Sequence, residues 1–154
     1  MTTKITTVSI VFLLLFLTQS VQQSQETKQL TVEANHSTVQ FIVPIANGIT
    51  RVTGKFTDYT IDLNLVDNDL TKSTISATIQ VKSINTGIEG RDDHLRTADF
   101  FDVEKYPEIT FNSERIEKVD DHYVVHGKFT MHGITKDISF PLISTGSSGE
   151  NTLG

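Results

Sequence analysis

The sequence predicts an all-β domain built from antiparallel strands. From about residue 38 onward, apolar and polar side chains alternate along several separate segments. A period of two places every second side chain on one buried face of a sheet. Short turn sequences such as Asn47-Gly48 and His132-Gly133 separate the segments, which favours antiparallel neighbours. Val and Thr are common throughout, and the strand–helix–strand rhythm of a parallel sheet is missing.

The alternating segments give the expected strand positions. In each of them Val, Ile, Leu or Phe takes the inward position and a polar residue usually takes the outward one. The segments cover residues 39–43, 52–56, 61–65, 75–81, 109–111, 123–131 and 138–142. We expect about eight strands between Leu30 and Ser144, some of which are alternatively parts of one long bent strand.

Residues 84–107 interrupt this pattern, because they show no strand period. Asp92 or Asp93 is a candidate N-cap for a short helix, and Thr97 is a candidate cap for another turn. Pro107 ends the segment. A connection of this length inside a compact domain is usually functional or packed. We therefore expect a helical or irregular plug that packs onto the strands through its apolar side chains: Leu95, Phe100 and Phe101.

The first 20 residues are expected to be a secretory signal peptide. Lys4 precedes an apolar run over residues 8–17, and Thr18-Gln19-Ser20 follows as a candidate cleavage region. The run is shorter than the roughly 20 apolar residues of a membrane span. The alternative is a buried or membrane-anchoring helix. Cleavage after Ser20 predicts a periplasmic or secreted protein whose strand domain covers residues 28–146, followed by a Ser/Gly-rich end at 147–154.

Charge and cysteine content exclude several classes of function. The net charge is −6 for the whole chain and becomes −7 without the signal peptide, in which Lys4 is the one charged residue. This overall balance argues against a nucleic acid or an anionic membrane surface as partner, since both select basic patches. The sequence contains no Cys, which excludes disulfides, thiol catalysis and cysteine metal sites.

Long stretches of the sequence resemble the YceI-like family of periplasmic lipid-binding proteins. The longest is RDDHLRTADFFDVEKYPEITFNS at 91–113. Shorter ones occur in the same order: NHSTVQFIV at 35–43, RVTGKFTDY at 51–59, SINTGIEGRDDHL at 83–95 and YVVHGKFTMHGITKDISFPL at 123–142. The resemblance implies an extended lipocalin-like β-barrel whose internal tunnel holds an isoprenoid chain, and it implies export. Many relatives carry a histidine shortly after the position that corresponds to residues 42–45. This sequence departs from that pattern, so no role of that histidine is assigned to a residue of this chain.

The resemblance also implies a further loop and two closing strands after the stretch ISFPLISTG. We therefore expect the chain to be incomplete at its C-terminus, with a closing strand supplied by a partner chain as the alternative. Without closure, the open edges of the sheet would template pairing with other chains.

The candidate binding residues are the inward apolar side chains together with the Phe pair of the plug. As tunnel-lining residues we predict Phe41, Val43, Phe56, Leu63, Ile79, Val81, Phe100, Phe101, Phe111 and Phe129. The alternative is a packed core without ligand, because small barrels commonly fill themselves. Arg91 and His94 are candidates for contact with a ligand head group. The alternative for these two is a structural network in which Arg and Asp satisfy the loop backbone.

No catalytic or metal-binding pattern is present in the sequence. His122 and His126 on one strand face would stand roughly 13 Å apart at about 3.3 Å per residue, too far for one metal ion. We therefore expect a protein without cofactor that binds a polyisoprenoid or isoprenoid quinone for carriage, storage or stress response. Its partners would be the lipid and possible further copies of itself. The rival hypotheses are an enzyme acting on such a lipid and a structural or interaction module without ligand.

Overall fold

Two antiparallel sheets carry most of the chain in the computed structural model, which describes residues 24–32 and 34–144. The larger sheet has six strands in the order β1-β4-β5-β7-β8-β9 and the smaller has three in the order β2-β3-β6. The larger sheet contains β1 (Thr27–Thr31), β4 (Tyr59–Val66), β5 (Asp69–Gln80), β7 (Glu108–Val119), β8 (His122–Met131) and β9 (Ile134–Leu142). The smaller sheet contains β2 (Val39–Ile45), β3 (Thr50–Phe56) and β6 (Ile84–Asn85).

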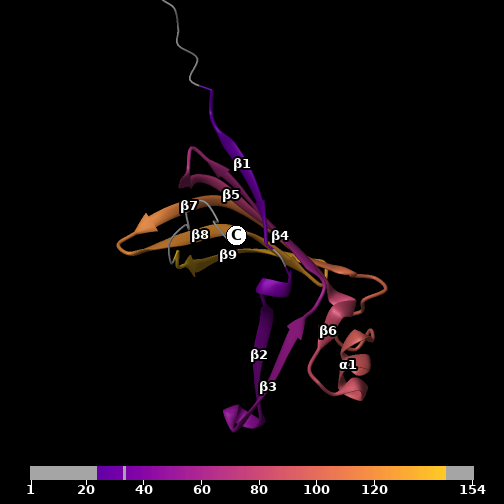
Figure 1. The fold of residues 1–154 in the computed structure, drawn as a ribbon. Coiled ribbons are helices and arrows are strands. Elements are labelled where there is room, and N and C mark those ends of the chain that lie inside the picture. Colours follow the sequence, from indigo (N-terminus) through magenta and orange to yellow (C-terminus); the bar gives the residue numbers. More distant parts are fainter. Residues whose placement is uncertain (1–23, 33, 145–154) are drawn as a thin grey trace, which may run out of the picture.

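In the described part of the chain, the remaining regular elements are one α-helix and three short 3₁₀ turns. Helix α1 spans Glu89–Arg96, and the turns are η1 (Ala34–His36), η2 (Ala46–Gly48) and η3 (Val81–Ser83). Figure 1 shows the larger sheet curved and twisted, with the β2–β3 hairpin projecting away from it and α1 lying beside β6. The smaller sheet and α1 therefore lie together at one end of the larger sheet.

The prediction of an all-β antiparallel fold is confirmed, whereas the sheets do not close into a barrel within the described residues. In that part of the chain, β1 and β9 are the two edges of the larger sheet. The smaller sheet has its own edges at β2 and β6. The expected lipocalin-like closure is therefore not seen there.

Tight two-residue turns make β4 and β5, and β8 and β9, direct neighbours in the larger sheet. Asp67 and Asn68, between β4 and β5, have φ of 51° and 56°, and His132 and Gly133, between β8 and β9, have φ of 52° and 73°. Two consecutive residues at positive φ match the twist of the flanking strands in a two-residue hairpin. The polar turn sequences seen along the chain therefore connect antiparallel neighbours directly.

Two details of the expected elements are corrected, and a third is confirmed. Strand β5 ends at Gln80, so Val81 belongs to the turn η3 and not to a strand. Neither Asp92 nor Asp93 is the N-cap of α1, because the helix begins at Glu89 with Ile88 in the cap position. The carboxylate of Asp92 bonds to Thr86 instead. Thr97 is the C-cap of α1, and its carbonyl also accepts the N–H groups of Phe100 and Asp102, so the next turn begins at Thr97 as expected.

Among residues 24–32 and 34–144, the buried apolar side chains form two core clusters. One lies where the two sheets meet and contains Phe56, Val81, Ile84 and Ile109. The other lies on the larger sheet and contains Phe111, Ile116 and Val125. The first cluster joins β3, η3, β6 and β7, so it fixes the position of the smaller sheet against the larger one.

Candidate functional site

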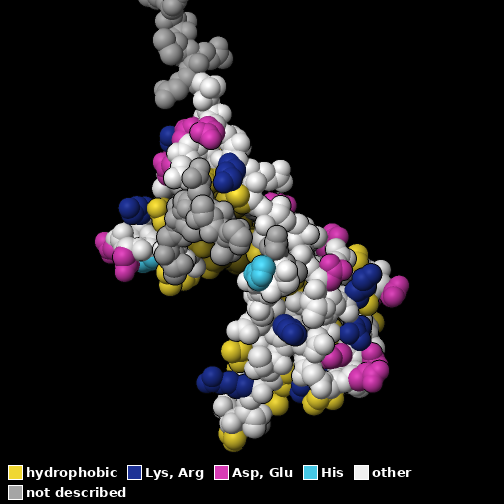
Figure 2. Space-filling model, in the orientation of Figure 1, with side chains coloured by type: hydrophobic (Ala, Val, Ile, Leu, Met, Phe, Trp, Pro, Cys, Tyr) yellow, Lys and Arg dark blue, Asp and Glu magenta, His cyan; other side chains and the backbone are white. Residues whose placement is uncertain are grey.

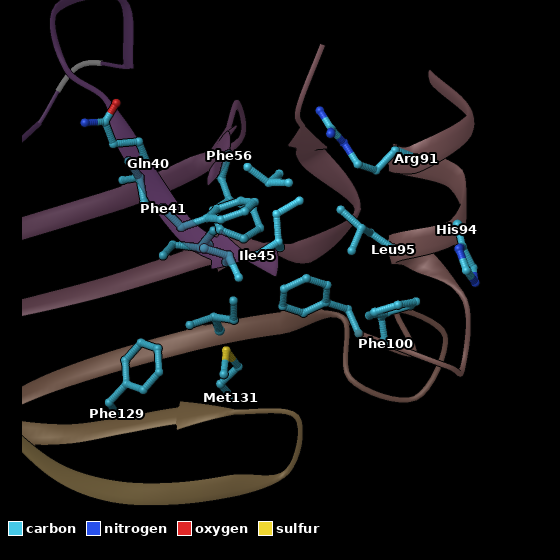
Figure 3. Close-up of a pocket in the computed structure, with 16 residues that line it drawn as sticks. Gln40, Phe41, Ile45, Phe56, Arg91, His94, Leu95, Phe100, Phe129 and Met131 are labelled. Carbon is cyan, nitrogen blue, oxygen red and sulfur yellow. The ribbon is translucent and has the colours of Figure 1, made fainter. Parts of the chain in front are cut away.

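An apolar pocket of about 770 Å³ lies between the two sheets, next to the first core cluster. Figure 3 shows its lining side chains converging from β2 and β3, from the larger sheet, and from the segment around α1. All but three of the lining residues are apolar. They are Val39, Gln40, Phe41, Val43, Ile45, Val52, Phe56, Ile79, Arg91, His94, Leu95, Phe100, Phe101, Ile109, Phe129 and Met131.

The smaller sheet supplies one wall through the inward row of each strand. Val39, Phe41, Val43 and Ile45 alternate along β2, as a period of two requires. Residue Gly54 faces Phe41 across the β2–β3 ladder. A Cβ at Gly54 would overlap the Phe41 ring, so the glycine is what lets that ring lie against the strand. The ring of Phe41 then reaches Phe56, with 5.6 Å between the ring centroids.

The larger sheet supplies the opposite wall. Ile79 on β5 is the direct partner of Ile109 on β7, and Phe129 and Met131 follow on β8. Ile109 is buried, but several lining residues at the rim are not. The exposed fractions are 50% for Phe100, 47% for Val43, 45% for Ile45 and 40% for Met131. The pocket is therefore open to solvent along a rim of apolar side chains.

The segment after β6 forms the third wall. Leu95 and Phe101 pack against the first core cluster, and the ring of Phe101 meets Phe56 edge-on at 6.4 Å. The backbone of this segment is bonded internally: the N–H of Phe101 donates to the carbonyl of Leu95 and that of Asp102 to the carbonyl of Thr97. The expected plug is thus an ordered wall of the pocket, with Phe101 packed inward and Phe100 half-exposed.

Polar side chains of α1 hold this wall in place. Asp92 is buried, and its Oδ1 accepts hydrogen bonds from the N–H and the hydroxyl of Thr86 at 2.8 and 2.6 Å. The hydrogen bond from the Thr86 hydroxyl lowers the pKa of Asp92 below its usual 3.8. At the other end of the helix, Arg96 donates to the carbonyl oxygens of Lys82 and Ile84, both at 2.9 Å. These bonds tie α1 to η3 and β6.

The two residues predicted to contact a head group have different surroundings. Arg91 lines the pocket, but its Nε donates to the Thr86 hydroxyl at 2.7 Å and its Nη2 to the Thr86 carbonyl at 2.9 Å. His94 also lines the pocket, and its ring pairs with that of Phe100, with 4.9 Å between the ring centroids (Figure 3). Arg91 therefore has a structural task at the pocket, as the alternative reading of the Arg/Asp cluster expected.

The structure brings most of the predicted tunnel residues together. Phe41, Val43, Phe56, Ile79, Phe100, Phe101 and Phe129 line the pocket. Three others do not. Val81 is 2% exposed inside the first core cluster, and Phe111 belongs to the second cluster. Leu63 on β4 faces Leu30 and Ile75 in the larger sheet. All three were expected to line the cavity. Val81 and Phe111 are instead packed in the core, and Leu63 lies on another part of the larger sheet.

Sequence reasoning missed several lining residues. Val39, Val52, Ile109 and Met131 lie in the same inward rows as predicted residues, so the alternation was the signal that would have found them. Leu95 was assigned to the plug without being placed at the cavity. Ile45 continues the inward row of β2, whereas Gln40 has the opposite parity and carries no such signal.

The histidines do not form a metal centre within residues 24–32 and 34–144, where no group of three metal-ligating side chains is present. His126 lies on the outer face of the larger sheet, because its neighbour Val125 is fully buried inside. Its Nδ1 is 2.7 Å from the Ser139 hydroxyl and its Nε2 is 3.2 Å from Glu117. This group lies away from the pocket. No helix in the described ranges has the length and apolar character that a membrane crossing needs.

Comparison with known proteins decides the family. The profile of the YceI-like domain matches residues 30–153. The chain belongs to the YceI-like family. A UPF0312 protein of Photorhabdus laumondii is 35% identical over 85 residues, which cover 55% of this chain and 44% of that protein. This YceI-like chain spans about half the length of the first curated relatives it matches.

Solved structures share the fold of this YceI-like protein. The Campylobacter jejuni YCEI protein is 33% identical, with a TM-score of 0.56 over 74% of this chain and 67% of that chain. A polyisoprenoid binding domain from Saccharophagus degradans, implicated in plant cell wall breakdown, is 17% identical. Its TM-score is 0.53 over 74% of this chain and 68% of that one, so this second likeness concerns the fold alone.

Proposed function

We propose that this protein binds a long apolar lipid of the polyisoprenoid or isoprenoid quinone type in the pocket between its two sheets. The function is carriage or storage of that lipid, including under stress, rather than its chemical conversion. The observation that carries the proposal is the pocket itself: about 770 Å³, lined almost entirely by apolar side chains and open at an apolar rim.

The pocket suits an apolar chain on physical grounds. Its volume falls in the range of roughly 300–1,000 Å³ that is usual for ligand sites. Each CH₂ group moved from water into such a site contributes about 0.8 kcal/mol. An isoprenoid chain longer than the pocket would leave its end at the rim, among Phe100, Val43 and Met131. Apolar burial therefore supplies the affinity without any dedicated polar group.

The comparisons support the same ligand class. The Saccharophagus degradans domain, which has the same fold, is named for polyisoprenoid binding. The family match covers all of the pocket-forming segments, from β2 to β8. Binding rather than catalysis is favoured because only three of the sixteen lining residues are polar, and the Nε and Nη2 of one of them, Arg91, already donate to Thr86.

Export and sheet closure belong to the proposal. Lys4 and the apolar run at 8–17 are the features of a secretory signal peptide, and they lie outside the described residues. We propose a periplasmic or secreted site of action on this ground. We also propose that the two sheets are parts of one extended lipocalin-like barrel that encloses the lipid.

The test is mass spectrometry of organic extracts from protein purified out of its own host. Met131→Glu places a carboxylate at the pocket rim and should reduce lipid per mole of protein at least tenfold. Val119→Glu is the matched control, because Val119 is 39% exposed against 40% for Met131 and does not line the pocket. Protein without any extractable isoprenoid or acyl lipid, or equal loss in both variants, would contradict the proposal.

A further inference from the structure

The outer face and tip of the β2–β3 hairpin expose apolar side chains that do not line the pocket. Ile49 at the tip is 84% exposed, and Ile42 on β2 is 54% exposed. Pro44, two residues along the same face, is also exposed. Isolated exposed apolar residues are ordinary, but a group of them on one projecting hairpin indicates a surface for contact with another phase or molecule.

The strand register places basic side chains on the same outer face. Pro44 lies opposite Arg51 across the β2–β3 ladder, and Gln40 lies opposite Lys55. Ile42 lies between these two cross-strand pairs, opposite Thr53. Arg51 and Lys55 are both exposed. The outer face therefore combines apolar side chains with two cations.

The hairpin differs in charge from the rest of the molecule. Residues 39–57 contain Arg51 and Lys55 and no Asp or Glu, whereas the whole chain has a net charge of −6. Figure 2 shows hydrophobic and basic side chains along the projecting hairpin and acidic side chains gathered over the neighbouring region of α1. The negative net charge of the whole chain argues against an anionic surface as partner. The hairpin itself is positively charged, so this objection does not apply to it.

The inner face of the same hairpin opens onto the pocket. Val43, Ile45 and Val52 alternate with the outer residues and line the cavity. Val43 and Ile45 are also rim residues, exposed by 47% and 45%. A phase that covers the hairpin tip would therefore also meet the open rim of the pocket.

We propose that the β2–β3 hairpin is a docking element for the surface of an anionic lipid bilayer. Ile49 and Ile42 enter the boundary between head groups and acyl chains, while Arg51 and Lys55 contact anionic head groups. Interfacial elements of this kind combine an apolar contact with Lys or Arg on its polar side. Docking would place the pocket rim at the membrane, so that the lipid could pass between bilayer and pocket without crossing water. This consequence of docking rests on the proposed lipid-binding function.

The test is co-sedimentation of the full chain with vesicles of phosphatidylcholine alone and of phosphatidylcholine with 30% phosphatidylglycerol. Binding should be detectable on the anionic vesicles and much weaker on the neutral ones. Replacing both cations, R51Q/K55Q, should weaken anionic binding roughly thirtyfold, from about 1 kcal/mol for each basic residue at such a surface. K28Q/K136Q removes two exposed cations elsewhere and should change binding less than threefold.

The apolar contribution is tested separately. Ile49→Ser should reduce binding to the anionic vesicles at least fivefold, whereas Ile134→Ser, at a 59% exposed position on the β8–β9 hairpin, should not. Equal binding to both vesicle types, or equal losses for R51Q/K55Q and K28Q/K136Q, would overturn the proposal. So would a concentration-dependent dimer that Ile49→Ser abolishes, because the hairpin would then be covered by a second copy.

Failure of this inference is distinguishable from failure of the proposed function. Ile49, Arg51 and Lys55 do not line the pocket, so lipid per mole of purified protein should stay within twofold of wild type in their variants. Lipid-loaded protein that ignores vesicles would refute the docking element and leave the binding function standing. Protein that binds vesicles through the hairpin but never carries lipid would refute the binding function alone.

Discussion

Asp92 in helix α1 and Thr86, just beyond the end of β6, are joined by two hydrogen bonds. A single carboxylate oxygen of Asp92 accepts both the backbone N–H and the hydroxyl of Thr86. The same hydroxyl accepts a hydrogen bond from Arg91. The three residues thus fix the first turn of α1 against β6, and with it the wall of the pocket that carries Leu95 and Phe101.

Acid should weaken this connection in a defined direction. The hydrogen bond from the Thr86 hydroxyl holds the pKa of Asp92 below 3.8 in the folded protein. A carboxyl group with a lowered folded pKa contributes stability that is complete above its unfolded pKa and is lost as pH falls through the folded value. We expect Asp92→Asn to lower the melting temperature at pH 7 and to flatten the loss of stability below pH 4, measured by thermal unfolding between pH 2.5 and 7.

Substitutions of Thr86, which donates both hydrogen bonds to Asp92, test the same connection. Thr86→Val removes the hydroxyl but keeps the backbone N–H bond, so it should shift the acid profile part of the way toward that of Asp92→Asn. Thr86→Ser keeps the hydroxyl and should retain the wild-type profile. Identical acid profiles for the wild type and Asp92→Asn would show that the hydrogen bonds contribute nothing measurable.

Two glycines should respond in opposite ways to the same substitution. A Cβ at Gly54 would overlap the Phe41 ring and crowd the Thr86 side chain, while a Cβ at Gly90 meets nothing. Gly54→Ala should lower the free energy of unfolding by about 1–3 kcal/mol through overpacking. Gly90→Ala lies within α1 and should raise it by up to about 1 kcal/mol. Urea unfolding of both variants checks the prediction, which fails if their effects have the same sign.

Phe111 should affect stability without affecting binding. It is 6% exposed in the second core cluster and is absent from the pocket lining. Phe111→Ala should cost about 3–5 kcal/mol of stability, because a large buried side chain is removed and the space is only partly refilled. Lipid per mole of folded protein should remain at the wild-type level. Selective lipid loss in a variant of near-normal stability would place Phe111 at the ligand after all.

The wall segment after α1 should be as protected as a strand. The N–H of Val103 donates to the carbonyl of Arg96, and that of Tyr106 to the carbonyl of Asp102. Leu95 and Phe101 anchor these bonds against the core. Hydrogen exchange followed by mass spectrometry should therefore show slow exchange over residues 101–106, comparable with β7. Exchange at the rate of an unstructured peptide would mean that the wall opens freely.

The alternation predicted the principal strands because it records which side chains are buried. Strands β2, β3, β4, β5, β7, β8 and β9 all have such rows. Strand β1 has none, since all five of its residues are exposed, and β6 has only two residues. Both strands are defined by pairing with distant residues, which a local pattern does not contain.

The pocket was less predictable than the strands for a related reason. The alternation tells on which face of a sheet a side chain lies. It does not tell which part of that face is filled by packing and which part borders the pocket. Phe41 and Phe111 both point inward, yet one lines the pocket and the other fills the core. The occupied donors of Arg91 were equally hidden, because Thr86 meets them only after α1 has packed against β6.

The wall of the pocket also has a consequence for how the chain folds. Strands β5 and β7 are direct neighbours, yet residues 81–107 lie between them in sequence. Bringing their ends together carries a loop-closure entropy that the adjacent hairpins β7–β8 and β8–β9 largely avoid. A shorter connection would lower that entropic barrier, but it would leave no room for α1 and Phe101. The β5–β7 ladder, whose intervening chain completes the pocket, is therefore expected to form later than these two hairpins.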